Sequence, residues 1–520
     1  MSVLTVVTRE DPHPGDGPLL DSLRHQTSSA WRLADSIPGD STGATAVLVV
    51  DASTRLEPHA VAALLDVLAD RRDAAAVYAD ALVDDELSLR PAWSVDLLRS
   101  GRPPGDPFVV RAEPMRATGW AGGASAADRL DLALRLSEMD ATLIHVPDVL
   151  AAGPAPPLDR SALARMVGEH IVRVGLPARA RAGTGPSPVE LEPRFTDQPS
   201  ISVVIPTAGT SREMSDGNSV RLVDRCVAGL DGCDWSDIEI VAVVGPEYDG
   251  DPGRLAELST RWRMKLVRRR SEPFSFPDAV NRGVLASAGD LVLVLNDDTE
   301  ALDPTWMARL AMRAVEPSVG AVGAGLVYPD GTVQHLGVVI DDARPLHPFV
   351  GTDVDRAGPD GIGAVARTVV AVTGACLMAR RADFLAVGGL TPELPMSYND
   401  VDLCLKLARQ GLRTVMEPAA RLIHHESASR PPVIDDWEWD RFVGRWGEIE
   451  DPWYHPGYFR PRDPDRPRLD VDHLLPGGPP AAAAPRDGRL RSRVHHSRTT
   501  VPDPASAEAR ERKERPERAE

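Results

Sequence analysis

The sequence of 520 residues predicts an α/β protein in which strands and helices alternate around a mostly parallel sheet. Three short apolar runs, 201–207, 238–245 and 291–298, are rich in β-branched residues and are typical of buried parallel strands. Helical patterns such as 219–230 lie between these runs. Because ligands bind at the carboxyl ends of strands in such sheets, we expect the ligand-binding site to lie where the first and third runs end.

The amino-terminal region repeats this alternation more faintly. Apolar runs at 1–7 and 45–54 flank a helical segment at 19–26, and the amphipathic stretch 59–72 follows the second run. This order of elements predicts a second α/β unit and an internal duplication.

Composition divides the chain further. Small, polar and proline residues gather between 178 and 200 and predict a linker. From about Asp470 onward the chain has almost no aromatic or β-branched residues, which predicts a disordered tail. The predicted segments are a first α/β domain at 1–177, a linker at 178–198, a second α/β domain with an aromatic carboxyl-terminal arm at 199–470, and a disordered tail at 471–520.

Charge and cysteine content exclude several classes of protein. The chain has 58 basic and 77 acidic residues, a net charge of −19, which argues against a general nucleic-acid binder. Its four cysteines form no Cys-x-x-Cys pair, so neither a zinc site nor a disulfide framework is expected. No apolar run reaches the roughly 18 residues that span a bilayer, and no signal peptide is evident. We therefore expect a cytoplasmic protein.

Paired carboxylates follow the third apolar run. Asn296, Asp297 and Asp298 stand at this strand end, where adjacent carboxylates are costly unless a positive group lies between them and a ligand. Mg²⁺ or Mn²⁺ with a diphosphate is the natural partner, since hard cations prefer carboxylate and phosphate oxygens. The structural alternative is that these residues cap a helix that begins near Asp303.

A second polar cluster lies farther along the chain. Asp400 and Asp402 precede an apolar helical pattern, and His424 and His425 follow the next apolar run. Carboxylates at a helix amino terminus are favoured by the helix dipole, so both aspartates also have a structural explanation. The joint occurrence of NDD, NDVDL and IHHES in this order is much less expected by chance than any single motif.

These motifs identify residues 199–430 as similar to an inverting glycosyltransferase of family 2 with a GT-A fold. The stretches that carry the resemblance are VVIPT, FSFPDAVNRGVLASAGDLVLVLNDDTE, VTGACLMARRADFLAVGGLTPEL, YNDVDLCLKLARQGL and LIHHESASR. The segment resembles bacterial rhamnosyltransferases of cell-wall, O-antigen and capsule assembly. The resemblance implies transfer of a sugar from a nucleotide-diphosphate donor to a glycan or polyprenyl-linked acceptor.

The resemblance also implies roles for individual residues. Asp400 matches the position of the catalytic base, which deprotonates the acceptor hydroxyl. Asp298 and His424 match positions that hold a divalent cation, Mn²⁺ or Mg²⁺. The residues that match donor-binding positions are Pro206, Thr207, Asp297, Gly374 and Ala375. This sequence departs from the family pattern at Val244-Gly245, where similar enzymes carry an acidic residue that contacts the nucleotide base, so the base is left open between uracil and thymine.

The first domain resembles the same family. The chain is therefore predicted to contain two GT-A-like domains, of which the first is degenerate. Ser53 stands where a second aspartate is usual, Arg129 falls on the base position, and Ala152 replaces the expected histidine. Arginine does not act as a general base at neutral pH. We therefore expect an inactive scaffold, acceptor-binding surface or dimer contact; the alternative is a second transferase of different specificity.

The sequence as a whole predicts a metal-dependent inverting glycosyltransferase of cell-envelope polysaccharide synthesis, with rhamnose as one candidate sugar. Its partners would be a nucleotide-sugar donor and a glycan or lipid-linked acceptor, with peripheral contact at the inner face of the plasma membrane and no nucleic acid. Alternatives are a non-catalytic sugar-binding or assembly module and a bifunctional two-site transferase. A dinucleotide-dependent oxidoreductase would need a Gly-x-Gly-x-x-Gly turn after the first strand, and residues 206–217 do not form one.

Overall fold

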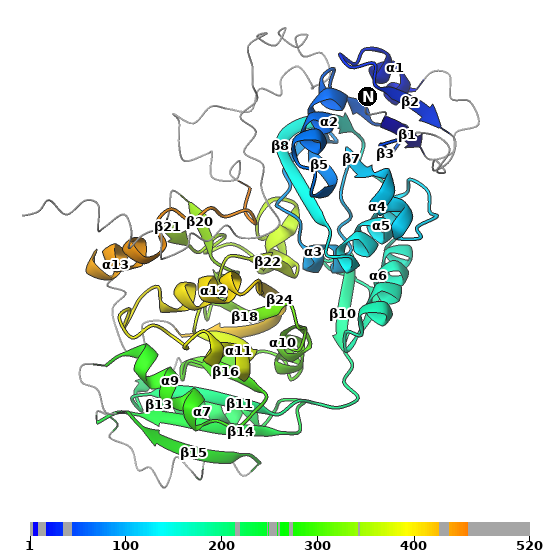
Figure 1. The fold of residues 1–520 in the computed structure, drawn as a ribbon. Coiled ribbons are helices and arrows are strands. Elements are labelled where there is room, and N and C mark those ends of the chain that lie inside the picture. Colours follow the sequence, from blue (N-terminus) through cyan, green and yellow to red (C-terminus); the bar gives the residue numbers. More distant parts are fainter. Residues whose placement is uncertain are drawn as a thin grey trace, which may run out of the picture. The chain divides into compact units, whose positions relative to one another are not determined.

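The computed structural model describes two compact units (Figure 1). The described residues are 4–8, 17–34, 44–213, 219–246, 248, 257, 261–269, 274–341, 344–425 and 436–455. Of these, the first unit contains those up to Gly175, with 179–191 and 452–455, and the second contains 176–178 and those from 192 to 451. The predicted disordered tail, 471–520, lies outside the described residues.

The first unit is a mixed sheet with helices packed on it. Its strands are β1 (Leu4–Thr8), β2 (Trp31–Ala34), β3 (Ala46–Val50), β4 (Arg55–Leu56), β5 (Ala74–Val83), β6 (Glu86–Ser88), β7 (Phe108–Arg111) and β8 (Thr142–Gly153). Its helices are α1 (Pro18–Arg24), α2 (Ala60–Asp70), α3 (Val95–Arg99), α4 (Ala112–Ala117), α5 (Ala126–Glu138) and α6 (Arg160–Val174). The strands lie in the order β2-β1-β3-β7-β5-β8-β4, with β6 beside β5.

The second unit contains a larger mixed sheet. Its strands are β11 (Ile201–Thr207), β12 (Ser211–Glu213), β13 (Ser219–Arg221), β14 (Ile238–Val244), β15 (Arg263–Arg268), β16 (Leu291–Leu295), β17 (Thr299–Ala301), β18 (Val319–Val327), β19 (Val333–His335), β20 (Val339–Asp341), β21 (Arg344–Leu346), β22 (Arg367–Val369), β23 (Cys376–Arg380) and β24 (Arg413–His424). Its helices are α7 (Leu222–Leu230), α9 (Phe276–Ala286), α10 (Trp306–Ala314), η2 (Val354–Arg356), η3 (Pro359–Ala364), α11 (Arg381–Ala386), α12 (Asn399–Arg409) and α13 (Asp436–Trp446). The main sheet has the order β15-β14-β11-β16-β23-β18-β24-β17.

The three predicted strands of the second unit are β11, β14 and β16, and every residue of each is buried. β11 pairs in parallel with both β14 and β16, and β14 pairs in parallel with β15. Beyond β16 the sheet is mixed, because β23 runs antiparallel to both β16 and β18. The predicted α/β class is therefore confirmed, with a sheet that is parallel on one side and mixed on the other.

The two units share one sheet topology. The order β2-β1-β3-β7-β5-β8-β4 in the first unit corresponds strand for strand to β14-β11-β16-β23-β18-β24-β17 in the second. The pairing directions also match: β3–β7 and β16–β23 are antiparallel, whereas β5–β8 and β18–β24 are parallel. This correspondence supports the internal duplication that the sequence predicts.

The stretch 178–198, for which the sequence predicts a linker, contains two strands, β9 (Ala178–Ala182) and β10 (Val189–Pro193), that pair with each other. Val189 and Leu191 alternate with more exposed residues on β10 and are buried, which explains why this polar segment has regular structure. Among the described residues, no helix has both the length and the apolar character needed to cross a membrane.

Candidate active site

The polar residues after β16 lie at the carboxyl end of the parallel strands. β16 ends at Leu295, and the chain turns through Asn296, Asp297 and Asp298 before β17. Thr207, the last residue of β11, donates a hydrogen bond from Oγ1 to Asp297 Oδ2 at 2.5 Å. Because β11 and β16 are parallel neighbours, their ends meet at one edge of the sheet and bring these two distant residues into contact.

Asp297 has a perturbed carboxyl group. Burial, reinforced by the negative charge of Asp298, raises its pKa to about 6, although the hydrogen bond from Thr207 opposes the shift. Such perturbation of one of two adjacent carboxyls is common at functional sites.

His424 faces Asp298 with a defined tautomer. Gln334 on β19 donates a hydrogen bond from its amide nitrogen to the backbone oxygen of His424 at 3.3 Å. This contact orients the amide so that Gln334 Oε1 accepts a hydrogen bond from His424 Nδ1 at 2.6 Å. In the neutral form of the ring the hydrogen is then on Nδ1, and Nε2 presents a lone pair.

The Asp298 and His424 side chains fit a divalent cation. His424 Nε2 lies 3.1 Å from Asp298 Oδ1. In the described part of the chain, no group donates a hydrogen bond to Asp298 Oδ1, which is buried. The Asp298 carboxylate oxygen therefore lacks a hydrogen-bond donor, and buried polar atoms rarely lack a partner. A cation that accepts oxygen and imidazole ligands would satisfy this atom and would take His424 Nε2 as a second ligand.

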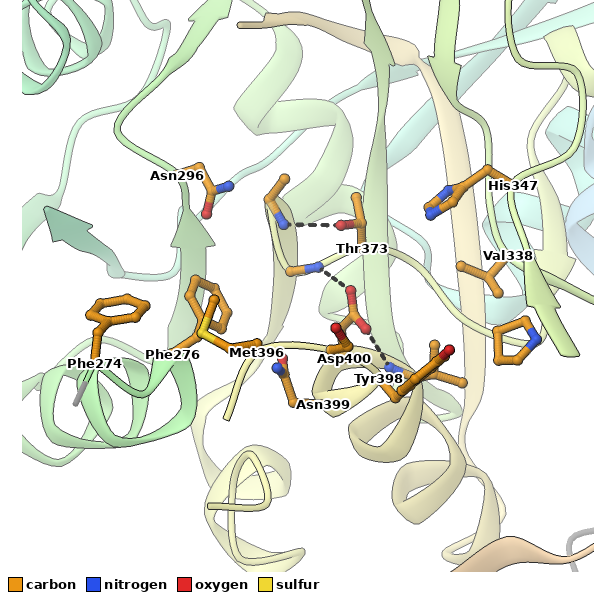
Figure 2. A pocket seen from close by; sticks show the side chains of 15 residues that line it. Phe274, Phe276, Asn296, Val338, His347, Thr373, Met396, Tyr398, Asn399 and Asp400 are labelled. Atoms are coloured by element: carbon orange, nitrogen blue, oxygen red, sulfur yellow. Dashed lines mark hydrogen bonds between the residues drawn. The ribbon is translucent and has the colours of Figure 1, made fainter. Parts of the chain in front are cut away.

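Asp400 lies in the first turn of α12 (Figure 2). Its Oδ2 accepts a hydrogen bond from the Gly374 backbone N–H at 2.9 Å, and its Oδ1 accepts one from Val401 N–H at 2.8 Å. A side chain at position 374 would meet the Phe276 ring at 3.1 Å and the Asp400 Cβ at 3.7 Å. The absence of a side chain at Gly374 therefore leaves room for the Phe276 ring, whereas the distance to Asp400 would be an ordinary van der Waals contact.

Asp400 opens onto a pocket of about 330 Å³ (Figure 2). The pocket is lined by apolar and aromatic side chains together with a few polar groups, as is usual for small-molecule sites. Its lining residues are Phe274, Phe276, Asn296, Val338, Pro345, His347, Thr373, Gly374, Ala375, Met396, Ser397, Tyr398, Asn399, Asp400 and Val401.

Most of the residues predicted from the sequence fall into two adjoining groups. Those that line the pocket are Gly374, Ala375 and Asp400. Those in contact at the strand end are Thr207 with Asp297, and Asp298 with His424. Asn296 connects the groups, since it lines the pocket and its amide nitrogen lies 3.3 Å from His424 Nε2. Pro206 lies within β11 and is not among the residues that line the pocket.

The corresponding region of the first unit holds an ion pair. Arg129, on α5, lies at the sequence position that matches Asp400, and its Nη1 contacts Asp106 Oδ1 at 3.1 Å. Asp106 precedes β7 much as Gly374 precedes β23, and its Oδ2 accepts a hydrogen bond from Thr54 Oγ1 at 2.7 Å. The groups that matched the base and its backbone contact have thus become an arginine and an aspartate that bind each other.

The strand pairing corrects one detail of this comparison. β4 pairs Arg55 with Ala152, while β17 pairs Glu300 with Ile423. Because Arg55 and Glu300 both follow the threonine after the strand end, the residue that matches His424 is Gly153 rather than Ala152. In either register no imidazole is present at this position.

A second group with metal-ligand side chains lies in the first unit. Asp80, His145 and His455 are buried, and their ligand atoms lie within 4.8 Å of one another. The Asp80 carboxylate accepts hydrogen bonds from both imidazoles, at 2.8 Å and 2.9 Å, and from the Arg90 backbone N–H at 2.8 Å. Hydrogen bonding thus accounts for these contacts without a metal.

Comparison with known proteins places this fold and site in a class. Residues 199–446 match the model of "Glycosyltransferase like family 2". The chain is 32% identical over 436 residues to the O-antigen biosynthesis protein RfbC of Myxococcus xanthus. This match covers 78% of this chain and 33% of that protein. It is 29% identical over 153 residues to an N-acetylglucosaminyl-diphospho-decaprenol L-rhamnosyltransferase of Mycobacterium tuberculosis, covering 27% of this chain and 48% of that protein. The chain spans less than half the length of these curated relatives.

Solved structures are more distant. The chain is similar to GalNAc-T7 with UDP, GalNAc and Mn²⁺, at a TM-score of 0.39 and 13% identity over 50% of each chain. It is also similar to the mannosyltransferase PcManGT of Pyrobaculum calidifontis in complex with GDP-Man and Mn²⁺, at a TM-score of 0.32 and 17% identity, covering 44% of this chain and 57% of that one.

The second unit is thus a glycosyltransferase domain of the α/β class. More specifically, residues 199–446 belong to glycosyltransferase family 2, which confirms the resemblance inferred from the sequence motifs.

Proposed function

We propose that the second unit transfers a sugar, with rhamnose as one candidate, from a nucleotide-diphosphate donor to a glycan or lipid-linked acceptor, with inversion at the anomeric carbon. The observation that carries the proposal is the position of Asn296, which lines the Asp400 pocket and contacts His424 beside the strand-end carboxylates. A base and a site for a diphosphate-bound cation therefore adjoin each other. This arrangement favours a transferase over a non-catalytic sugar-binding or assembly module.

Asp400 is the proposed general base. As the acceptor oxygen bonds to the anomeric carbon, Asp400 takes the proton of that hydroxyl, and the bond between the anomeric carbon and the diphosphate oxygen breaks. A single displacement of this kind needs one base and inverts the anomeric configuration. The contacts from Gly374 and Val401 N–H hold the carboxylate in place without supplying a competing proton acceptor.

Asp298 and His424 are the proposed cation ligands, and Thr207 and Asp297 the proposed contacts to the donor. When bound, Mn²⁺ or Mg²⁺ would offset the negative charge that develops on the leaving diphosphate. The printed names of the relatives, an O-antigen biosynthesis protein and a rhamnosyltransferase of a lipid-linked substrate, support a role in polysaccharide assembly.

The test is a panel of UDP-, dTDP- and GDP-sugars, incubated with the full chain in the presence of Mn²⁺ or of EDTA. Release of nucleoside diphosphate from at least one donor, dependent on the cation, is the expected result. Failure of every donor to bind or react would reject the proposed function.

Mn²⁺ is expected to stabilise the wild-type protein and not the Asp298→Asn variant. At a cation concentration about 100 times the Kd, binding adds roughly 2.7 kcal/mol, which raises the Tm of a domain of this size by roughly 5–10 °C. The amide oxygen is a weaker ligand and carries no charge. Differential scanning fluorimetry with and without Mn²⁺ measures the shift, and Asp436→Asn, at an exposed site on α13, is the matched control. Equal shifts in wild type and Asp298→Asn would contradict the ligand assignment.

We also propose that the first unit does not catalyse transfer. Its Arg129–Asp106 ion pair replaces a free base, and Ser53 stands where Asp298 lies in the second unit. An acceptor-binding or scaffolding role fits the replacement of these site residues. The alternative is a second transferase site.

The double variant Asp51→Asn/Asp128→Asn is expected to leave every sugar addition intact. Asp51 Oδ1 accepts hydrogen bonds from Ser53 within its own turn, and the Asp128 carboxylate caps α5 through Ser125. Loss of the cap costs about 1 kcal/mol of stability, so the protein should remain folded. Mass spectrometry of the glycan product is the measurement. Loss of one of two sugar additions would instead show that the first unit is a second transferase.

A further inference from the structure

Tyr398 lines the pocket in a backbone conformation that few side chains adopt. It directly precedes α12, two residues before Asp400, and has φ 61° and ψ −1°. This left-handed region is strained for a bulky residue, and such strain is concentrated at functional sites. Among the described non-glycine residues with positive φ, Tyr398 is the one that lines the pocket.

Main-chain contacts hold Tyr398 in this conformation. Glu438 on α13 is 1% exposed, and its Oε1 accepts hydrogen bonds from Met396 N–H at 2.8 Å and Ser397 N–H at 3.1 Å. Asp402 N–H donates to the Tyr398 backbone oxygen at 2.8 Å. None of these contacts uses the Tyr398 side chain. Because glycine or asparagine would make the same contacts with less strain, the backbone does not explain why a tyrosine stands here.

The Tyr398 ring packs on aromatic side chains of α13. It stacks on Phe442, with ring centroids 5.1 Å apart and planes 27° apart, and lies tilted against Trp439 at 5.6 Å. Phe442 is 1% exposed, so this face of the Tyr398 ring is covered. Tyr398 itself remains partly exposed. The ring therefore offers its opposite face and its hydroxyl edge to the cavity.

The Tyr398 hydroxyl is a hydrogen-bond donor at neutral pH. Burial raises its pKa above the ordinary value, so the phenol keeps its proton. No group in the described part of the chain forms a hydrogen bond with this hydroxyl. A polar partner for it is therefore expected to come from the cavity.

The position of Tyr398 indicates which substrate it meets. Figure 2 shows Tyr398 on the side of Asp400 away from Asn296. Asn296 belongs to the strand end at which the donor diphosphate is proposed to bind. The acceptor hydroxyl attacks from the face opposite the leaving diphosphate, so the Tyr398 side of the proposed base is the acceptor side.

We propose that the Tyr398 ring is the surface on which a neutral pyranose ring of the acceptor packs, with the phenol hydroxyl donating to a hydroxyl group of that sugar. This inference rests on the proposed function of the second unit. A pyranose has apolar C–H groups on its faces and hydroxyl groups at its edge, which match the face and the O–H edge of a tyrosine. An anionic group finds no such match, because the aromatic face is electronegative.

Binding is tested without turnover by saturation-transfer-difference NMR. The full chain is mixed with methyl glycosides of neutral pyranoses. Tyr398→Asn removes the ring and is compatible with positive φ, whereas Tyr398→Phe keeps the ring. Transfer to the ring C–H protons is expected with wild type and Tyr398→Phe and not with Tyr398→Asn. Equal transfer with wild type and Tyr398→Asn, or no transfer with wild type, would overturn the proposal.

The substrate role is tested by steady-state kinetics with the donor found in the nucleotide-sugar panel and octyl glycosides of neutral sugars as acceptors. Tyr398→Asn is expected to raise the KM for the acceptor about tenfold, with the KM for the donor within about twofold. Tyr398→Phe loses only the hydroxyl and is expected to raise the acceptor KM about threefold. The matched control is Trp437→Ala, at an exposed ring on α13 that does not line the pocket.

The outcomes separate this inference from the proposed function. If wild type releases no nucleoside diphosphate from any donor, the proposed function fails. If wild type is active but Tyr398→Asn leaves the acceptor KM unchanged, the role of Tyr398 fails while the function stands. An equal rise in both KM values would mark Tyr398 as a structural residue and would also reject the proposal. If Tyr398→Asn does not fold, an unchanged acceptor KM in Tyr398→Phe would reject it.

Discussion

Replacing Asp400 by asparagine is expected to lower the rate of sugar transfer by about two to four orders of magnitude without unfolding the protein. The amide does not take the proton of the acceptor hydroxyl, so the displacement loses its base. The Asn oxygen still accepts a hydrogen bond from Gly374 N–H or Val401 N–H, the two groups that donate to the Asp400 carboxylate in the wild type. The measurement is single-turnover transfer with the donor identified in the nucleotide-sugar panel.

Binding measurements distinguish loss of the catalytic base from loss of the folded site. Donor affinity and Tm of Asp400→Asn should stay close to those of wild type, because Asp400 is proposed to meet the acceptor and the substitution is isosteric. Asp436→Asn, an exposed aspartate, should retain full activity. Full activity of Asp400→Asn would reject the assignment of the base.

Replacing Asp402 by alanine is expected to give the largest loss of stability, about 3–5 kcal/mol. The Asp402 carboxylate is fully buried. Its Oδ1 accepts from Trp446 Nε1 at 2.9 Å and contacts Arg445 Nε at 2.8 Å, while its Oδ2 accepts from Thr391 and lies 3.2 Å from Lys406 Nζ. Truncation leaves the largely buried Lys406 ammonium without this counter-charge, and it disconnects α12 from α13.

Equilibrium unfolding in urea, followed by tryptophan fluorescence, measures this loss. The exposed Asp440→Ala on α13 is the matched control and should change the free energy of unfolding by no more than about 0.5 kcal/mol. A loss below about 1 kcal/mol for Asp402→Ala would mean that the buried carboxylate contributes no more than a surface ion pair.

Local sequence patterns predicted much of the fold. The runs at 201–207, 238–245 and 291–298 are β11, β14 and β16 because continuous β-branched apolar segments are stable only where both faces of a sheet are covered. The strand-end aspartates could be identified for the same reason, since parallel strands place their carboxyl ends together. The ribbon at 178–193 was harder to predict, because only two of its residues, Val189 and Leu191, are apolar and buried.

Asp400 and Asp402 show where local patterns are insufficient. The helix dipole accounts equally for both, yet two residues in an α-helix differ by about 200° in direction, so one side chain faces the pocket and the other the interior. Gln334 gave no signal, since its role depends on β19 meeting His424, a residue distant in sequence. Strand pairing alone does not reveal which imidazole nitrogen carries a hydrogen.

The ion pair between Arg129 and Asp106 couples two positions that are distant in sequence. Arg129 is 1% exposed, so changing it to an acid would set two carboxylates against each other, and changing Asp106 to glycine would leave a buried cation without its counter-charge. Each single change is therefore expected to destabilise the first unit. Installing an acid at position 129 thus calls for a compensating change at position 106 in the same variant.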